Sequence, residues 1–495
     1  MKTTVLLVSA TRPDPAALGG VDVHVAALAT SARHAEVLSA YPSSSGFVVE
    51  AWNPRRPVAV VSILPGEDAH GGVGAAIAAA LRGTRADVLH VHSPGLGARA
   101  IAAASARTGC PLVVTLHDHS LVCENYTLLE GNVRYCGIPV DLRRCDRCLT
   151  KTYARPAGAV QDWRADMHVL VERTRVFVAP SASVLDHAAR VHPGVRERSR
   201  RIAWGVPDAS ARRLRRRDSS RAGLMGARGT SGRGAETPLR IAVVGVFATV
   251  KGADRLPELL SACRGLDVEW HLFGATEGAS QRALHATGAS VIAHGAYRRS
   301  ELARRVTNAD CRVALLPSIF PESFSLALSE VTAAGLPVIG TNLGALGERI
   351  AEGSLGWTFD PFDPTRFASL VAGLVADRAL VETAAARVDA LPVRTESDMA
   401  ADHDALWASL GSARADSTNA SRPQDTPTDD ELDALFAKGI RNSAAHPESR
   451  LEKWVRAVRQ SEFYRDLGLR RVLSESTRHA VDDAIARLAS RRRRR

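Results

Sequence analysis

The sequence has 495 residues, of which 45% are hydrophobic and 24% charged, as in an ordinary soluble globular protein. This composition excludes a disordered, collagen-like or disulfide-scaffold chain, and the length suits two domains with appendages. The sequence contains no run of 18 apolar residues, so no membrane span is predicted. The short apolar run at the start predicts a first β-strand rather than a signal peptide. We therefore expect a cytoplasmic protein whose seven cysteines stay reduced.

The net charge of +11 is concentrated in two segments. Residues 208–238 hold eight arginines and three acidic residues, and the chain ends in five arginines, Arg491–Arg495. Each segment contributes a net +5, so the rest of the chain is close to neutral. Because no nucleic-acid-binding motif accompanies the charge, it indicates a nearby anionic surface and argues against nucleic acid as a partner.

Residues 1–207 alternate short apolar runs with Ala-rich segments that have a helical pattern. Helices are expected at 21–35 and 95–108, and strands at 5–8, 58–63, 88–91, 112–116 and 176–179. Strands that alternate with helices predict right-handed βαβ units and a mostly parallel sheet. The Arg-, Ser- and Gly-rich residues 208–238 break the pattern and are predicted to be a flexible linker or insertion.

The same alternation restarts at Leu239 and runs to about Leu410. Strands are expected at 240–244, 269–273, 290–293, 312–316 and 337–339. The predicted fold class is therefore α/β, with two tandem Rossmann-like, doubly wound lobes (1–207 and 239–410). Such lobes bind a ligand in the cleft between them, at the carboxyl ends of the strands. A second linker (411–428) and a basic, amphipathic helical tail (429–495) follow.

The segment 315–330 is the strongest candidate site. An apolar strand ends at Pro317, a loop follows, and a helix pattern begins near Ser323. The backbone N–H groups of Ser325 and Leu326, at the start of this helix, would be free to hold a phosphate.

Two glutamates flank this predicted phosphate site. Glu322 would stand at the helix entry and Glu330 about 12 Å along the helix. A carboxylate at each end suits a sugar nucleotide, with Glu322 on sugar hydroxyls and Glu330 on ribose hydroxyls. The alternative is that Glu322 is a first-turn acid favoured by the helix dipole and that Glu330 is solvated.

Lys251 follows the first strand of the second lobe and precedes Gly252. The chain has 59 arginines and five lysines, so a lysine here departs from its usual choice of cation. A compact ammonium at the carboxyl end of a strand can neutralise a diphosphate. The alternative is a surface lysine before a helix.

The first lobe contributes three further candidates. Gly19 and Gly20 precede the first helix and allow close approach of a phosphate or sugar, or simply form a tight turn. His117 lies at a strand end, where it could donate to a substrate hydroxyl, and Asp118 could orient it or contact the sugar. The alternative is a structural histidine. His90 and His92 are expected to be packing residues.

Four cysteines lie within 26 residues: Cys123, Cys136, Cys145 and Cys148. The last two have metal-ligand spacing, and together the four could hold a structural Zn²⁺. Free thiols in a packed loop are the alternative.

Taken together, these motifs over residues 1–400 resemble the retaining, nucleotide-sugar-dependent glycosyltransferases of the two-lobed GT-B type, family four. The most specific match is Glu322-x7-Glu330 with the following Ala334-Gly-Leu-Pro-Val338. The cysteine loop and the segment 344–349 resemble a subset from bacterial surface-polysaccharide synthesis.

The resemblance implies that Lys251 and the Ser325–Leu326 amides bind the diphosphate, that Glu330 binds the ribose and that Glu322 binds the transferred sugar. It places His117 at the reaction centre and Gly20 near the phosphates or the acceptor, and it implies no metal for catalysis. Two positions depart from the family pattern. Val246 stands where many members carry a diphosphate-binding arginine, and Ser325 where glycine is usual.

The resemblance implies retaining transfer of a hexose from a UDP- or GDP-type sugar to a glycan or lipid-linked glycan acceptor, in bacterial cell-surface polysaccharide synthesis. A catalytically silent GT-B scaffold that binds a partner glycosyltransferase or a glycan is one alternative, and a nucleotide-sugar epimerase is another. The basic tail predicts peripheral docking on the anionic inner membrane leaflet. The alternative is a helical appendage that packs on the lobes or on a partner.

Overall fold

The structure is a computed structural model. It describes residues 2–51 except 16, 18, 44 and 45, together with residues 69–208, 237–275 and 283–415. The expected strand at 58–63, nearly all of the basic linker and the tail from 429 onward lie outside these residues. No helix among the described residues is long and apolar enough to cross a bilayer.

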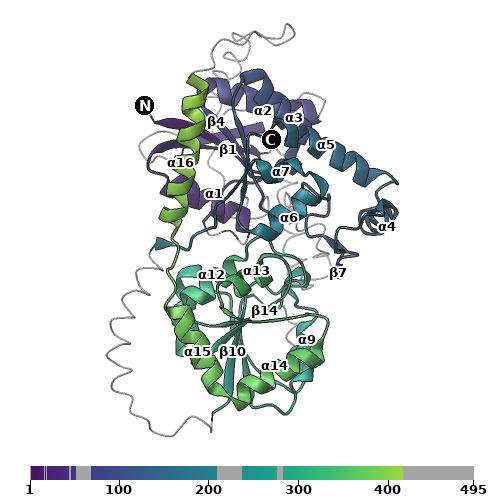
Figure 1. Cartoon of the computed structure of the whole chain (residues 1–495), viewed down its shortest axis with the longest axis vertical. Helices are drawn as coiled ribbons and strands as arrows, with labels where there is room; N and C mark the ends of the chain where they lie inside the picture. The colour runs from purple at the N-terminus through teal and green to yellow at the C-terminus, as the bar shows by residue number, and fades with distance from the viewer. Residues whose placement is uncertain are drawn as a thin grey trace, which may run out of the picture. The chain divides into compact units, whose positions relative to one another are not determined.

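The first lobe is built on a seven-stranded sheet in the order β3-β2-β1-β4-β5-β8-β9 (Figure 1). Every neighbouring pair is parallel except β2 and β3, which confirms the mostly parallel sheet. Its strands are β1 (Thr3–Val8), β2 (Ala35–Ser43), β3 (Gly46–Ala51), β4 (Val88–Val91), β5 (Leu112–Thr115), β8 (Val176–Ala179) and β9 (Ser199–Arg201).

Helices cover both faces of this sheet because its strands are apolar on both sides. One face packs on α2 (Ala69–Gly83), α3 (Ala98–Thr108), α5 (Ala159–Arg173) and α6 (Ala182–Val191). The other packs on α1 (Gly20–Ser31) and α16 (Glu396–Ala415). The lobe also contains η1 (Pro94–Leu96), the hairpin β6 (Leu129–Glu130) and β7 (Arg134–Tyr135), α4 (Leu142–Tyr153) and α7 (Gly194–Glu197).

The second lobe has a six-stranded, all-parallel sheet in the order β12-β11-β10-β13-β14-β15. Its strands are β10 (Leu239–Val244), β11 (Val268–Phe273), β12 (Ser290–Gly295), β13 (Val313–Leu316), β14 (Val338–Thr341) and β15 (Gly356–Phe359). Its helices are η2 (Thr249–Lys251), α9 (Leu256–Ala262), η3 (Arg299–Glu301), α11 (Leu302–Asn308), α12 (Leu326–Ala333), α13 (Gly344–Glu352), α14 (Pro364–Ala376) and α15 (Arg378–Asp389). The two doubly wound lobes predicted from the alternation are confirmed.

The last described helix, α16, departs from the sequence prediction. The pattern assigned residues up to about Leu410 to the second lobe, yet α16 packs on α1 and β1 of the first (Figure 1). The carboxylate of Asp404 accepts hydrogen bonds from the backbone of Arg33, His34 and Ala35 at 2.9, 3.0 and 3.0 Å. Asp404 is buried, and its carboxylate satisfies three backbone donors.

Candidate functional site

The loop between β13 and α12 carries Glu322. The helix was expected from near Ser323, but α12 begins at Leu326, so Glu322 lies in the loop rather than in a first helical turn. Its side chain is buried, accepts a hydrogen bond from Ser318 Oγ and forms an ion pair with Lys251, Nζ to Oε2 2.7 Å. Glu322 is therefore paired with a cation in a buried loop.

Lys251 ends η2 and is aimed at this loop by the residue that follows. Gly252 has φ +84°, and a Cβ there would lie 2.0 Å from the carbonyl oxygen of Pro317, so only glycine permits the approach. The Lys251 ammonium lies 5.1 Å from the centre of the Phe320 ring. Lys251 also lines a small hollow with Gly245, Val246 and Pro317. The predicted lysine and the predicted glutamate therefore meet at one point.

The N-terminus of α12 lies opposite the N-terminus of α1. A Cβ on Gly20 would lie 3.7 Å from Leu326 Cδ1, an ordinary van der Waals contact, so the two helix starts lie close together. Ser325, the N-cap of α12, has φ +69°, which is a left-handed conformation, and its hydroxyl is buried without a partner in the described part of the chain.

The first turn of α1 already contains the carboxylate of Asp22, which accepts a hydrogen bond from Thr11. The first turn of α12 contains no acidic residue. Of the two helix starts, α12 is therefore the better anion site, because the dipole at its N-terminus is not already matched by a carboxylate.

Glu330 is buried rather than solvated. Its Oε1 accepts a hydrogen bond from Arg299 Nε at 2.5 Å, and its side chain is 10% exposed. Burial raises the pKa of Glu330, whereas Arg299 and a hydrogen bond with Tyr297 lower it. Arg299 also lies 3.8 Å from Glu396. Arg299 and Tyr297 escaped the sequence analysis, although both lie within four residues of the end of β12.

His117 lies in a cluster of buried histidines at the ends of β4 and β5. Its Nε2 is 2.8 Å from His92 Nδ1, and its ring packs on His24 and Trp204. Burial lowers the pKa of His117 to about 3, so the imidazole is neutral at physiological pH. Its Nδ1 has no partner among the described residues.

The neighbouring histidines differ in what holds them. His90 is a packing residue, as expected, because Thr115 and Trp407 take both ring nitrogens. His92, also expected to be a packing residue, is instead the hydrogen-bond partner of His117.

Asp118 and His119 continue the strand end. The Asp118 carboxylate accepts from the backbone of Ser120 at 2.9 Å, and burial raises its pKa. His119, which the sequence analysis did not single out, donates from Nε2 to the carbonyl oxygen of Pro321 at 2.7 Å. The histidine strand end therefore contacts the Glu322 loop directly.

The four cysteines surround one another closely enough to affect each other's ionisation. Burial, with smaller contributions from the other three thiols, raises the pKa of Cys123 to about 12. All four are free thiols, and they do not form a group with ligand atoms placed to hold a metal ion. A structural Zn²⁺ at this loop stays a prediction.

Among the described residues, the one group with ligand atoms close enough to hold a metal is His24, His92 and His117, whose ligand atoms lie within 4.8 Å of one another. Two of its nitrogens are only 2.8 Å apart. Two nitrogens on one tetrahedral zinc stand about 3.3 Å apart. No carboxylate is part of the group, so it fits hydrogen-bonded neutral imidazoles better than a metal centre.

Two Rossmann-like lobes with a site at the carboxyl ends of their strands define a GT-B architecture. Residues 18–210 match the family model "Glycosyltransferase Family 4", and residues 231–388 match "Glycosyl transferases group 1". Together the matches span both lobes, and the chain belongs to the GT-B glycosyltransferases. No curated protein sequence matches it.

Solved structures with the same fold include HepE from Anabaena in complex with UDP (TM-score 0.55, 16% identity, 83% of this chain and 100% of that chain). Sucrose-phosphate synthase from Thermosynechococcus elongatus gives a TM-score of 0.54 at 18% identity, with 83% and 100% covered. The lipopolysaccharide outer core galactosyltransferase WaaB gives 0.53 at 12% identity, with 82% and 99% covered.

Proposed function

We propose that this chain transfers a hexose, with retention, from a UDP- or GDP-type sugar to a glycan or lipid-linked glycan acceptor in bacterial surface-polysaccharide synthesis. The observation that carries the proposal is the meeting of Lys251, Glu322 and the acid-free N-terminus of α12 in the second lobe. The presence of UDP in the HepE structure and the lipopolysaccharide role of WaaB support the donor class and the pathway.

In this proposal the leaving diphosphate is stabilised electrostatically. The Ser325 and Leu326 amides donate to it, and Lys251 adds a full positive charge. Because Lys251 is now paired with Glu322, donor binding would draw the ammonium toward the diphosphate and free Glu322 for the sugar hydroxyls. Glu330, which is paired with Arg299, would accept from the ribose hydroxyls.

His117 would serve the reaction as a neutral hydrogen-bonding group. Because its pKa is about 3, it cannot act as a cationic acid near neutral pH. With its Nε2 near His92, its unpartnered Nδ1 is the atom available to a substrate. We assign no nucleophile, which accords with retention through a diphosphate-stabilised single-face displacement. Asp118 and Gly20 would shape the sugar and acceptor side.

Catalysis is proposed to need no metal. The cysteine loop is proposed to take one structural Zn²⁺, which metal analysis of protein purified under reducing conditions would detect. Loss of that zinc on Cys145→Ser/Cys148→Ser replacement would support the site, and protein free of zinc would refute it.

The tail, which lies outside the described residues, is proposed to hold the enzyme on an anionic leaflet beside a lipid-linked acceptor. Flotation with phosphatidylserine vesicles should weaken when Arg491–Arg495 are deleted. Unchanged flotation would remove the electrostatic basis of this proposal.

The test of function is turnover with UDP- and GDP-linked hexoses. Slow release of nucleoside diphosphate by the full chain is expected, with at least tenfold loss in Lys251→Met and in His117→Ala. An altered sugar without nucleoside diphosphate release would indicate an epimerase. A folded chain that binds glycan and releases nothing would indicate the silent scaffold.

A further inference from the structure

The five carbonyl groups that precede α12 are all held from outside the loop. Pro321 O accepts from His119 Nε2 (2.7 Å), Glu322 O from the Ala345 amide (2.8 Å) and Ser323 O from Ser181 Oγ (2.7 Å). The next two carbonyls share a single donor, described below. A backbone whose carbonyl side is fully occupied presents its N–H side to the site.

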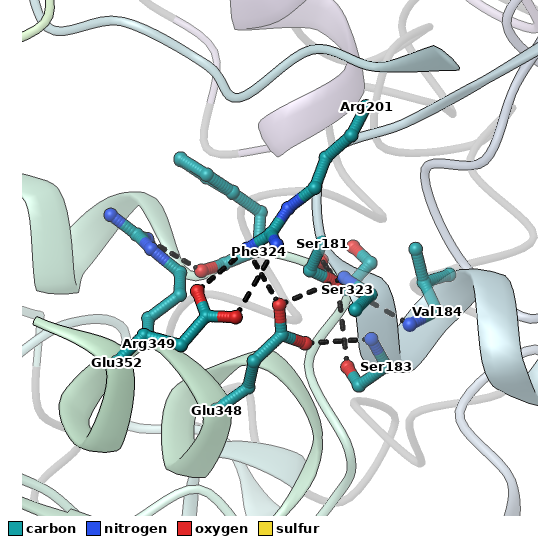
Figure 2. A network of polar contacts seen from close by, with 10 residues as sticks. Ser181, Ser183, Val184, Arg201, Ser323, Phe324, Glu348, Arg349 and Glu352 are labelled. Atoms are coloured by element: carbon teal, nitrogen blue, oxygen red, sulfur yellow. Dashed lines mark hydrogen bonds and ion pairs between the residues drawn. The ribbon is translucent and has the colours of Figure 1, made fainter. Parts of the chain in front are cut away.

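That donor is the guanidinium of Arg349, on α13. Its Nη1 donates to Phe324 O at 2.7 Å and to Ser325 O at 3.0 Å, and its Nη2 donates to Ser329 Oγ at 2.9 Å. It also lies 3.9 Å from the centre of the Phe324 ring. Figure 2 shows Arg349 on α13 directed at the Phe324 carbonyl, beside Glu348 and Glu352. One rigid fork thus fixes both residues before the helix start.

The residue that Arg349 holds is the one whose conformation is strained. Ser325 has φ +69°, a conformation that side chains other than glycine avoid. Such a conformation persists only where the surroundings over-determine it. The Arg349 contacts on the carbonyls of 324 and 325 provide that restraint, and they orient the Leu326 amide.

Arg349 is also a cation that forms no direct ion pair. Its hydrogen bonds go to two carbonyls and a hydroxyl, and none of the ion pairs of the described residues includes it. Burial lowers its pKa to about 10, which leaves it charged at neutral pH. The carboxylates of Glu322, Glu348 and Glu352 interact with it electrostatically and oppose this lowering.

We propose that Arg349 is a positioning residue for donor binding: it holds the Phe324–Ser325 turn so that the Ser325 and Leu326 amides form an anion cradle. This inference rests on the proposed function. Arg349 lies behind the turn, on its carbonyl side, and acts through the amides rather than by contact with the donor. Val246, the position of the missing arginine, lines the hollow together with Lys251.

The adjacent residue ties the same helix to the first lobe. Glu348 accepts from the Ala182 and Ser183 amides at the start of α6 (2.8 and 2.6 Å) and from Arg201 (2.8 Å). Arg201 belongs to the same network (Figure 2), and among the described residues its side-chain hydrogen bonds go to Glu348 and Glu352 rather than to the turn. Arg201→Met is therefore a matched control for Arg349→Met.

The test measures UDP and GDP affinity of the full chain by calorimetry, with folding checked by thermal unfolding. Arg349→Met should weaken binding at least tenfold, and Arg201→Met at most twofold. Ser325→Gly removes the need for the restraint, because glycine adopts a positive φ without strain. In the Arg349→Met background it should restore nucleotide affinity at least threefold.

Wild-type affinity in Arg349→Met, or no recovery in the double variant with a normal melting temperature, overturns the positioning role. If Arg349→Met does not fold, Arg349→Lys replaces it, since lysine keeps the charge but cannot bind both carbonyls as a fork. Failure of the wild-type chain to bind either nucleotide would instead refute the proposed function, and the inference with it.

Discussion

Replacing Asp404 by alanine should destabilise the first lobe, although the residue comes almost 200 positions after that lobe appears to end in the sequence. Its carboxylate holds three consecutive amides where α1 gives way to β2. The Ala35 amide is buried, whereas Arg33 and His34 are exposed and their amides could be rehydrated. The three hydrogen bonds therefore contribute unequally to the stability of the lobe.

Loss of the bond to a buried amide costs about 2 kcal/mol, and each of the two exposed ones about 0.5–1 kcal/mol. The sum is about 3 kcal/mol, which shifts the melting temperature of a unit of about 200 residues by roughly 6–12 °C. Asp402, two residues earlier, is half exposed and paired with Arg394, so Asp402→Ala should cost less than about 1 kcal/mol.

Differential scanning calorimetry of the two variants measures this difference. Equal and small shifts for Asp402→Ala and Asp404→Ala would refute the account in which α16 is fastened to the first lobe through this carboxylate. A large shift for both would mean that the helix itself, rather than the cap, is the sensitive feature.

Lys251→Met should weaken nucleotide binding at least tenfold and also lower the stability of the chain, because buried Glu322 loses its cation. Adding Glu322→Gln to this variant should restore stability but not nucleotide binding. Scanning and titration calorimetry measure the two effects. Stability should fall as the pH drops from about 6.5 toward 4, because histidines such as His403 (pKa about 4) are buried uncharged and bind a proton only when unfolded. The loss is at most about 2 kcal/mol per histidine at pH 5, and a His403→Gln variant whose pH profile is as steep as wild type would contradict this. Gly20→Ala should be tolerated. Gly20→Leu should lower turnover at least tenfold without unfolding the chain, because the leucine side chain must displace Leu326. Normal kinetics in Gly20→Leu would show that turnover does not require the close approach of the α1 and α12 N-termini.

The sequence predicted the two lobes well because a parallel sheet covered on both faces leaves long apolar runs. It missed β2, where polar residues interrupt the strand, its antiparallel neighbour β3, and the short β9 and β15. The return of α16 to the first lobe could not be predicted, since a helix pattern does not specify which core its apolar face joins. Asp404 is the clearest case, because its burial is explained only by the positions of three distant backbone amides.

At the site, the sequence identified Lys251, Glu322 and Glu330, and the structure brings the first two into contact. It placed the start of α12 three residues too early. The local pattern near Ser323 could not reveal that the backbone carbonyls before the helix accept hydrogen bonds from distant groups. Arg349 and Arg299 act through tertiary contacts, so no spacing along the chain points to them. The burial of Glu330 beside Arg299 is likewise a tertiary property.

The most direct test of the central claim is calorimetric titration of the full chain with UDP and GDP, in wild type and in Glu330→Ala. The account predicts that one nucleoside diphosphate binds the wild type and that the variant, shown to be folded by thermal unfolding, binds it at least tenfold more weakly. If neither nucleotide binds the wild type, or if Glu330→Ala binds as well as wild type, the second lobe does not hold a nucleotide-sugar donor in the way proposed.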